Sequence, residues 1–211
     1  GMAMLEEGYA PALIDNVGRM TGMPRGPLEM HDDVALDLSY KIAKQTALDL
    51  GDAYVPAEGA DIVAKMVEGG RYGRKNGKGF YDYDSKPKTL WAGLSELAPV
   101  KFDDSTPELV DELKTRLLYR QAVEVARCWA EGVIDDPREA DLGAILGWGF
   151  APWSGGPITL IDQTGLKAFV ETADRLAATY GDRFKVPELL REMAAKGETF
   201  YGRFAPEKKA A

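Results

Sequence analysis

The chain carries the same series of sequence landmarks twice. Each copy has a glycine-proline pair followed five positions later by an aspartate: Gly26, Pro27 and Asp32 in the first copy, and Gly156, Pro157 and Asp162 in the second. A Glu-Gly pair precedes each copy, and a Tyr-Gly-Arg triplet follows each one, at residues 72–74 and 201–203. Four landmarks in one order indicate a duplication. Two similar units can pack against each other within one polypeptide as identical subunits do about a two-fold axis.

The duplication divides the 211 residues into two predicted domains. We place the first copy at residues 1–86 and the second at residues 104–211, and residues 87–103 form the linker because they contain prolines and little periodicity. Helical periodicity and proline or glycine punctuation predict a helix from Pro11 that Gly22 stops, helices at 27–50, 60–68, 107–132 and 137–147, a helix from Pro157 with a break near 164–165, and a last one at 187–197. Residues 80–83 are the single candidate for a short extended piece. The expected fold is all-α, with two tandem homologous helical domains related by a pseudo-two-fold axis.

Composition excludes several classes of function. Hydrophobic residues make up 45% of the chain and charged residues 28%, and the net charge is −8. An acidic chain does not favour nucleic acid or an anionic membrane as a partner, and no apolar run approaches the roughly 20 residues that span a bilayer. The N-terminus has no secretory signal, and the single Cys128 fits a buried position in a reducing, cytoplasmic compartment. Gly1 before Met2, and the helical character of the next residues, predict a piece of a longer polypeptide.

The sequence assigns no catalytic, cofactor-binding or metal-ligating residue to this chain. It contains no Gly-x-Gly-x-x-Gly segment after a strand, which is what holds the pyrophosphate of a dinucleotide, so we do not expect this chain alone to bind NAD. The only histidine, His31, adjoins Asp32 and Asp33. Such a cluster suits a metal site or an acid-base pair, but consecutive helical residues point in different directions. We therefore favour a structural role for His31.

Asp32 and Asp162 allow two interpretations. A catalytic role for both would require two active sites in one chain. In the structural interpretation, which we favour, each carboxylate accepts hydrogen bonds from backbone amides in the turn before its helix, or pairs with a basic side chain across the repeat. The glycines of the motif, Gly26 and Gly156, then permit an unusual backbone angle or a close approach of another segment.

The loop at residues 70–83 concentrates cations and aromatic rings in an otherwise acidic chain. Its cations would hold a phosphate and its rings would stack on a base, which suits coenzyme A, a nucleotide or single-stranded nucleic acid. Alternatively, the loop is a glycine-rich turn whose rings fill a gap between helices while the cations stay in solvent. The candidate substrate-binding residues are Arg74, Lys75, Lys78 and Phe80.

Four motifs together resemble the C-terminal part of 3-hydroxyacyl-CoA dehydrogenases, in the duplicated form found in the large subunit of the bacterial multifunctional fatty-acid oxidation complex. The motifs are LEEG at 5–8, MPRGPLE at 23–29 with Asp32 and Leu36-Asp37, KNGKGFY at 75–81, and GFAP at 149–152 with GGP at 155–157. The chain departs from the family pattern at Ala35, where glycine is usual and where the second copy has Gly165, and at Asn76, where threonine is common.

The resemblance implies a helical fold similar to the C-terminal domain of 6-phosphogluconate dehydrogenase. In this family a Rossmann-type domain carries NAD and a catalytic histidine-glutamate pair, and His31 does not match that histidine's motif. The resemblance further implies that the helical domains close over acyl-CoA and form the dimer contact, which a fused second copy replaces. The alternative from another class is a non-catalytic module that docks a thiolase or another subunit of fatty-acid β-oxidation. The position of exposed apolar surface separates the two hypotheses.

Overall fold

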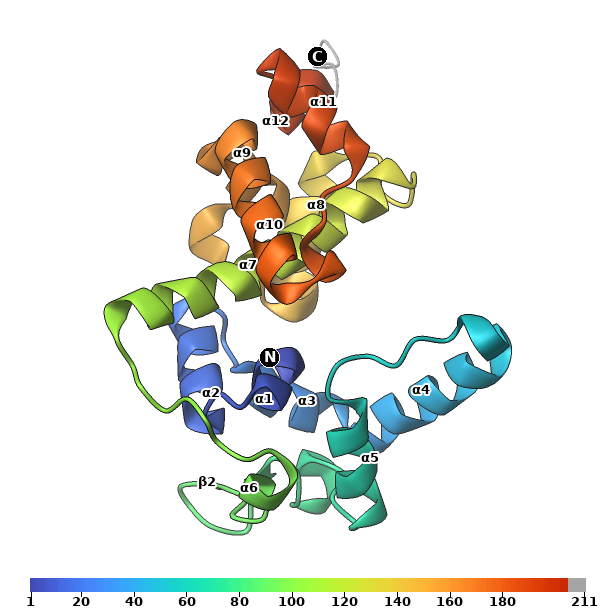
Figure 1. The fold of residues 1–211 in the computed structure, drawn as a ribbon, viewed down its shortest axis with the longest axis vertical. Coiled ribbons are helices and arrows are strands. Elements are labelled where there is room, and N and C mark those ends of the chain that lie inside the picture. Colours follow the sequence, from blue (N-terminus) through green and yellow to red (C-terminus); the bar gives the residue numbers. More distant parts are fainter. Residues whose placement is uncertain (205–211) are drawn as a thin grey trace, which may run out of the picture. The chain divides into compact units, whose positions relative to one another are not determined.

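The computed structural model of the protein describes residues 1–204, and it is helical nearly throughout (Figure 1). This confirms the predicted all-α class. Strands β1 (Tyr81–Asp82) and β2 (Thr89–Leu90) pair antiparallel, so the predicted extended piece at residues 80–83 is a two-residue strand. The chain forms two compact units: unit 1 comprises residues 1–19 and 25–110, and unit 2 comprises residues 20–24 and those from 111 onward.

Unit 1 is built from short helices. They are α1 (Met2–Glu7), α2 (Pro11–Met20), α3 (Pro27–Val34), α4 (Leu36–Leu50), α5 (Ala60–Glu68) and α6 (Leu94–Leu97), with the single-turn elements η1 (Gly51–Ala53) and η2 (Arg74–Asn76). Helices α4 and α5 pack against each other. The interior of the unit includes the fully buried side chains of Ile14, Val17, Leu28, Leu36, Met66 and Phe80.

Residues 87–103 pack as part of unit 1. The amide of Lys101 donates to the Gly8 carbonyl at 2.7 Å, and the amide of Ala10 donates to the Phe102 carbonyl at 2.8 Å. The rings of Tyr9 and Phe102 lie 5.0 Å apart. The stretch that the sequence marks as a connection therefore has ordered contacts, because its backbone pairs with the turn after α1.

Unit 2 surrounds a larger apolar core. Its elements are α7 (Pro107–Ala130), which begins in unit 1, α8 (Pro137–Trp148), η3 (Pro152–Ser154), α9 (Pro157–Thr164), α10 (Leu166–Tyr180), η4 (Asp182–Phe184), α11 (Glu188–Lys196) and α12 (Phe200–Phe204). The core joins α7, α9, α10, α11 and α12 through Val123, Ile161, Phe169, Leu190 and Phe200. The rings of Tyr119 and Phe169 stack at 4.3 Å between α7 and α10.

Residues 20–24, from the last residue of α2 into the turn before α3, belong to unit 2. The indole N–H of Trp153 donates to the Thr21 carbonyl at 2.7 Å, and the side-chain amide of Gln121 lies 3.6 Å from the sulfur of Met23. Sequence periodicity gives no indication that residues 20–24 pack with unit 2, because this packing depends on contacts between residues more than 90 positions apart in the chain.

The prediction of one helix over residues 27–50 is wrong. The helix ends at Val34 and a new one begins at Leu36, because Ala35 adopts φ 86° and ψ 121°. Gly165 has nearly the same angles, φ 84° and ψ 126°, at the predicted break between α9 and α10. Ala35 is the one residue other than glycine with a positive φ in the described part of the chain. Alanine is a good helix former, so the sequence gives no local sign of the break.

The other predicted helices agree closely with the structure. Helix α5 has the predicted bounds, α2 begins at Pro11 as predicted and ends two residues before Gly22, and α7 begins at Pro107 with the Thr106 hydroxyl accepting from the Leu109 amide at 3.3 Å. Helix α12 was not predicted. It spans five residues, which is too short for a periodic apolar pattern to emerge.

Ala35 provides a test of backbone strain. We expect Ala35→Gly to stabilise the protein by about 1 kcal/mol, since only glycine adopts this conformation without steric cost. Gly165→Ala should destabilise it by about 1 to 2 kcal/mol, because alanine is strained at this positive φ. A Cβ there meets no other atom within 4 Å, so the effect comes from the backbone conformation alone. Urea unfolding of each variant measures both changes.

Gly147→Ala is the matched control for the glycine substitution. Gly147 lies inside α8 with no positive φ and open space around it, so alanine should be neutral or slightly stabilising there. A destabilising Ala35→Gly would contradict the assignment of strain to this residue.

Candidate functional site

A buried aspartate connects α2 to the start of α3 in unit 1. Asp15 lies on α2 and is fully buried. Its carboxylate accepts the backbone amides of Leu28 at 2.7 Å and Glu29 at 3.1 Å, which are among the free amides in the first turn of α3. The Tyr81 hydroxyl donates to the same carboxylate at 2.7 Å. Asp15 thus caps a helix to which it is not sequence-adjacent.

A second buried aspartate holds the segment around β1. Asp32 on α3 accepts the backbone amide of Phe80 at 2.8 Å and that of Tyr81 at 3.0 Å, and the Tyr83 hydroxyl donates to it at 3.0 Å. Tyr81 therefore joins both aspartates, through its hydroxyl to Asp15 and through its amide to Asp32. We call this arrangement the Asp-Tyr-Asp bridge.

Unit 2 contains the first half of the same bridge. Asp141 on α8 accepts the backbone amides of Ile158 at 2.7 Å and Thr159 at 3.1 Å in the first turn of α9. The Tyr201 hydroxyl donates to it at 2.9 Å. Asp141 is therefore the counterpart of Asp15.

The second half of the bridge is also present in unit 2. Asp162 accepts the backbone amides of Phe200 at 2.8 Å and Tyr201 at 3.0 Å. The hydrogen bonds identify Tyr201 as the counterpart of Tyr81. The sequence alignment of the two Tyr-Gly-Arg triplets, which matched Tyr201 with Tyr72, is thus wrong, because a short repeated triplet does not fix which tyrosine reaches the aspartates.

Asp32 and Asp162 accept backbone amides, as expected for a structural role, but their donors lie 38 to 49 residues away and not in the turn before the helix. That turn is served by Asp15 and Asp141, which the sequence analysis missed. A signal was available for Asp15, because this acid interrupts the apolar face of α2. A charged residue on a buried face needs partners.

The glycine of each Gly-Pro pair permits the bridge to form. A Cβ on Gly26 would overlap the side chain of Asp15, and a Cβ on Gly156 would overlap that of Asp141. The following prolines, Pro27 and Pro157, are the first residues of α3 and α9, where a missing amide hydrogen has no cost. The motif is therefore a device for bringing a carboxylate onto a helix start.

Burial raises the pKa of Asp32 and of Asp141, and hydrogen bonds to each carboxylate oppose the rise. Burial also raises the pKa of the tyrosines that donate to these carboxylates, and it raises that of Tyr201 to about 12. The carboxylates are fully engaged by protein donors and lie out of solvent. Each carboxylate holds backbone amides and tyrosine hydroxyls of its own unit.

Removing the charge of one aspartate should destabilise its unit. In Asp32→Asn and in Asp162→Asn, an amide NH2 replaces an oxygen that accepts a backbone amide, and two donors then face each other. We expect each substitution to lower the free energy of unfolding by about 2 kcal/mol, as measured by urea denaturation. The exposed Asp135→Asn is the control and should change stability by less than about 0.5 kcal/mol. Parental stability in both bridge variants would contradict this role.

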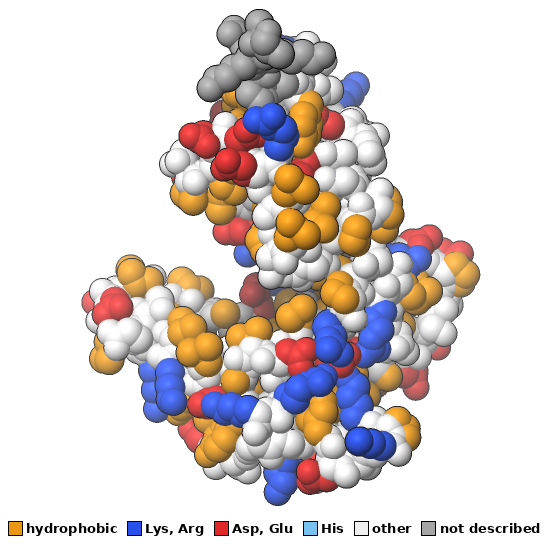
Figure 2. All heavy atoms as spheres, turned by 180° about the vertical axis from the view of Figure 1, so that it is seen from behind, with side chains coloured by type: hydrophobic (Ala, Val, Ile, Leu, Met, Phe, Trp, Pro, Cys, Tyr) orange, Lys and Arg blue, Asp and Glu red, His pale blue; other side chains and the backbone are white. Residues whose placement is uncertain are grey.

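A cluster of cations surrounds one carboxylate on unit 1. The Glu29 side chain is only 4% exposed, and four cations contact it: Arg19 at 2.5 Å, Arg25 at 2.8 Å, Arg74 at 3.3 Å, and Lys88. Figure 2 shows blue side chains gathered closely around red ones on one face. Burial alone would raise the pKa of Glu29, but hydrogen bonds from Lys88 and Arg19 outweigh burial and lower it to about 2.

This lowered pKa gives a pH-dependent contribution to stability. Because the folded state holds the proton of Glu29 more weakly than the unfolded state, the contribution is present above about pH 4.5 and is lost as the pH falls towards 2. Glu29→Gln should therefore be less stable than the parent by about 2 kcal/mol at pH 7. The difference should shrink steadily from pH 5 to pH 2 in urea unfolding. Lys88→Gln should shift this loss to higher pH, whereas a pH-independent difference would refute the assignment.

The structure separates the four residues predicted to contact a substrate. Arg74 belongs to the Glu29 cluster and also contacts Asp33 at 2.5 Å. Lys75 pairs with Asp37, and Lys78 is exposed. Phe80 is 0% exposed, so it is a core residue and is not retained as a ligand contact. Phe80 and Tyr81 pack inward while Lys75 and Lys78 stay exposed, as in the structural alternative, but Tyr72 is exposed and Arg71 is buried.

His31 is largely buried and makes no metal site. Its ring stacks over Phe80 with centroids 6.1 Å apart, and Nε2 lies 3.5 Å from the Ser39 hydroxyl. Burial lowers the pKa of His31. Between residues 1 and 204, no three His, Cys, Asp or Glu side chains converge as a metal site would require. None of the helices in this stretch combines the length and apolar character needed to cross a membrane.

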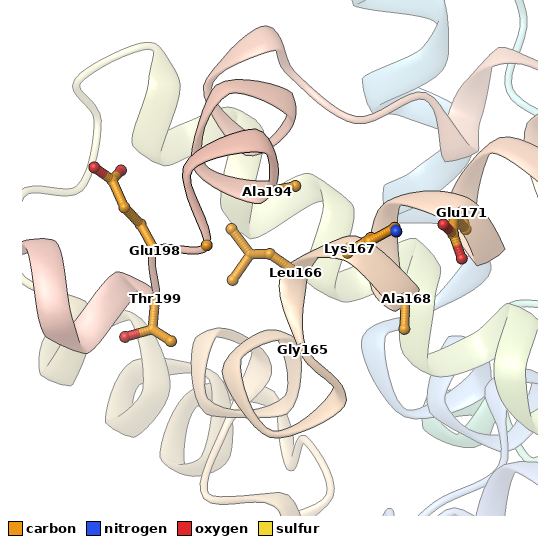
Figure 3. A pocket seen from close by; sticks show the side chains of 9 residues that line it. Gly165, Leu166, Lys167, Ala168, Glu171, Ala194, Glu198 and Thr199 are labelled. Carbon is orange, nitrogen blue, oxygen red and sulfur yellow. The ribbon is translucent and has the colours of Figure 1, made fainter.

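An open pocket of about 410 Å³ lies at the start of α10 in unit 2 (Figure 3). Leu166, Lys167, Ala168 and Glu171 line it from α10, together with Gly165 before the helix. The other wall comes from the end of α11 and the turn that follows, through Ala194, Gly197, Glu198 and Thr199. No residue proposed from sequence lies in this pocket.

Comparison with known proteins identifies relatives for both units. The family model of the 3-hydroxyacyl-CoA dehydrogenase C-terminal domain matches residues 1–83. The fatty acid oxidation complex subunit alpha of Vibrio parahaemolyticus is 36% identical over 180 residues, which cover 85% of the chain and 25% of that protein. The same subunit of Shewanella loihica is 35% identical over 198 residues, 94% of the chain and 28% of that protein. The chain thus spans about a quarter of the length of these relatives.

Two solved structures share the fold. The 3-hydroxybutyryl-CoA dehydrogenase of Escherichia coli K12 superposes with a TM-score of 0.65 at 19% identity, over 92% of this chain and 56% of that one. The dehydrogenase part of multifunctional enzyme 1 from C. elegans superposes with a TM-score of 0.59 at 21% identity, over 90% of this chain and 43% of that one. At these identities the comparison establishes the fold.

Proposed function

Because the chain belongs to the 3-hydroxyacyl-CoA dehydrogenase C-terminal domain family, we propose that it is the substrate-closing, pseudo-dimeric helical part of an NAD-dependent 3-hydroxyacyl-CoA dehydrogenase of fatty-acid oxidation. The proposal places NAD and the residues that take up the proton and hydride in a Rossmann-type domain outside this chain. This chain contains no Gly-x-Gly-x-x-Gly segment, and no proton or hydride transfer is attributed to its residues.

The observation that carries the proposal is the occurrence of the Asp-Tyr-Asp bridge in both units. In each unit, one aspartate caps a helix start and a second holds the returning segment. Equal bridges support a duplicated domain, and a duplicated domain supports pairing of the two copies within one subunit. Such a helical body would orient acyl-CoA and exclude water from the reacting carbon, and orientation accounts for a large part of catalysis with two bulky substrates.

The cations of the loop fit an acyl-CoA partner. Arg74, Lys75 and Lys78 keep part of their side chains exposed, and coenzyme A carries phosphate groups that cations bind. In the proposal Lys78 is the best placed of the three, because Arg74 and Lys75 are also held by Asp33 and Asp37.

A chimera tests the proposal. The chain replaces the segment that it matches in the Vibrio parahaemolyticus subunit, and oxidation of NADH with acetoacetyl-CoA is measured. We expect activity within about tenfold of the parent subunit, whereas the subunit without this segment should lose at least about 100-fold, since orientation and closure are lost. Lys78→Gln in the chimera should raise KM for acetoacetyl-CoA and leave kcat unchanged. The isolated chain should be inactive, and dehydrogenase activity of the isolated chain would contradict the proposal.

A second candidate function is a module that docks a thiolase or another subunit of the oxidation complex. It is favoured by the apolar residues that α4 leaves exposed, Leu38, Ile42, Leu48 and Leu50. The same chimera separates the two functions. A docking module would leave the dehydrogenase rate of the truncated subunit intact and would change only the assembly state measured by analytical ultracentrifugation.

A further inference from the structure

The pocket at the start of α10 corresponds to a place that unit 1 fills with its own chain. Helices α4 and α10 follow the same break, at Ala35 and Gly165, and both begin with a buried leucine. In unit 1 the amide of Leu36 donates to the Tyr72 carbonyl at 3.1 Å. The loop that contains Tyr72 therefore lies directly on the start of α4.

The two units differ in the length of this loop. In unit 1 it comprises residues 69–78, between α5 and the segment that Asp32 holds. In unit 2 only residues 197–199 connect α11 to the segment that Asp162 holds. The shorter connection leaves the start of α10 open, and Figure 3 shows Leu166 and Lys167 on one side of the pocket and Glu198 and Thr199 on the other.

The charges at the two helix starts are reversed. In unit 1 Asp37 pairs with Lys75 of the loop and with Lys41 one turn along the helix. In unit 2 the residue after the leading leucine is Lys167, and one turn along is Glu171. A segment that fills the pocket as the loop fills unit 1 would therefore carry an acidic side chain where the loop carries Lys75.

The remaining wall of the pocket suits a peptide. Leu166, Ala168 and Ala194 contribute apolar surface, and about 410 Å³ lies within the range of ligand sites. Glu198, the other acid of the wall, pairs with Arg203 at 2.8 Å. Its charge is thus already compensated, and Lys167 sets the preference for an incoming charged group.

We propose that this pocket binds an extended segment of a partner protein, which places a backbone carbonyl on the Leu166 amide and a carboxylate on Lys167. The proposal does not depend on dehydrogenase activity, because it rests on the difference between the two units. Under this proposal unit 2 has a docking role that unit 1 lacks, since in unit 1 the loop at residues 69–78 occupies the corresponding site at the start of α4.

Two synthetic peptides test this proposal on the full chain. One has the sequence of residues 69–79, and the other has the same sequence with Glu in place of Lys75. Nuclear magnetic resonance titration at low salt follows the amides of Leu166, Lys167 and Thr199. We expect the peptide with Glu at position 75 to shift these amides with an affinity about three- to tenfold higher than the peptide with Lys75, because its carboxylate attracts the Lys167 ammonium whereas Lys75 repels it. The preference should reverse in Lys167→Glu.

Matched variants complete the experiment. Lys185→Glu makes the same charge change elsewhere in unit 2 and should leave the preference as it is, whereas Ala168→Phe should fill the pocket and abolish binding of both peptides. If neither peptide shifts these amides at millimolar concentration, the proposal is overturned. An unchanged preference in Lys167→Glu would also overturn it. A rise in peptide affinity after removal of residues 205–211 would also overturn it, since the chain's own end would then be the occupant.

Discussion

Four carboxylates that accept backbone amides, three of them buried, hold the two units together. Asp15 and Asp141 each cap a helix from another helix, and Asp32 and Asp162 each hold the segment that returns from the far end of the unit. A buried charge is costly without partners and stabilising when several donors surround it. The geometry of each unit therefore depends on donors supplied by residues that are distant in sequence, and the Gly-Pro pairs are required because no side chain fits beside these carboxylates.

Around this framework the connection that leads to the held segment differs in length between the two units. The longer loop of unit 1 contributes Arg74 to the Glu29 cluster and places Lys75 on Asp37. The shorter connection of unit 2 leaves a pocket at the same position, and the second residue of α10 is Lys167 where the second residue of α4 is Asp37. A change of loop length keeps the hydrogen-bonded framework while it changes the surface, since loops tolerate insertions that helices do not.

Local signals account for the helices that the sequence predicted. Pro11, Pro27, Pro107 and Pro157 begin helices where a first-turn proline is tolerated, and Gly149 and Gly197 end helices in the left-handed conformation. The site was harder to predict. Phe80 was assigned to substrate contact because its ring belongs to a loop of cations and aromatics that suits stacking on a base, yet its amide is bound by Asp32 and its ring is in the core.

The sequence by itself determined the helical class and most helix limits, because these depend on periodicity and capping within short stretches, and its repeated motifs predicted two similar copies. Only the tertiary structure decided that Tyr81 and Tyr201 correspond, that Ala35 interrupts a helix, and that residues 20–24 pack with unit 2. Each of these depends on contacts between distant residues, whose free energy overrides local preference and leaves no periodic trace in the chain.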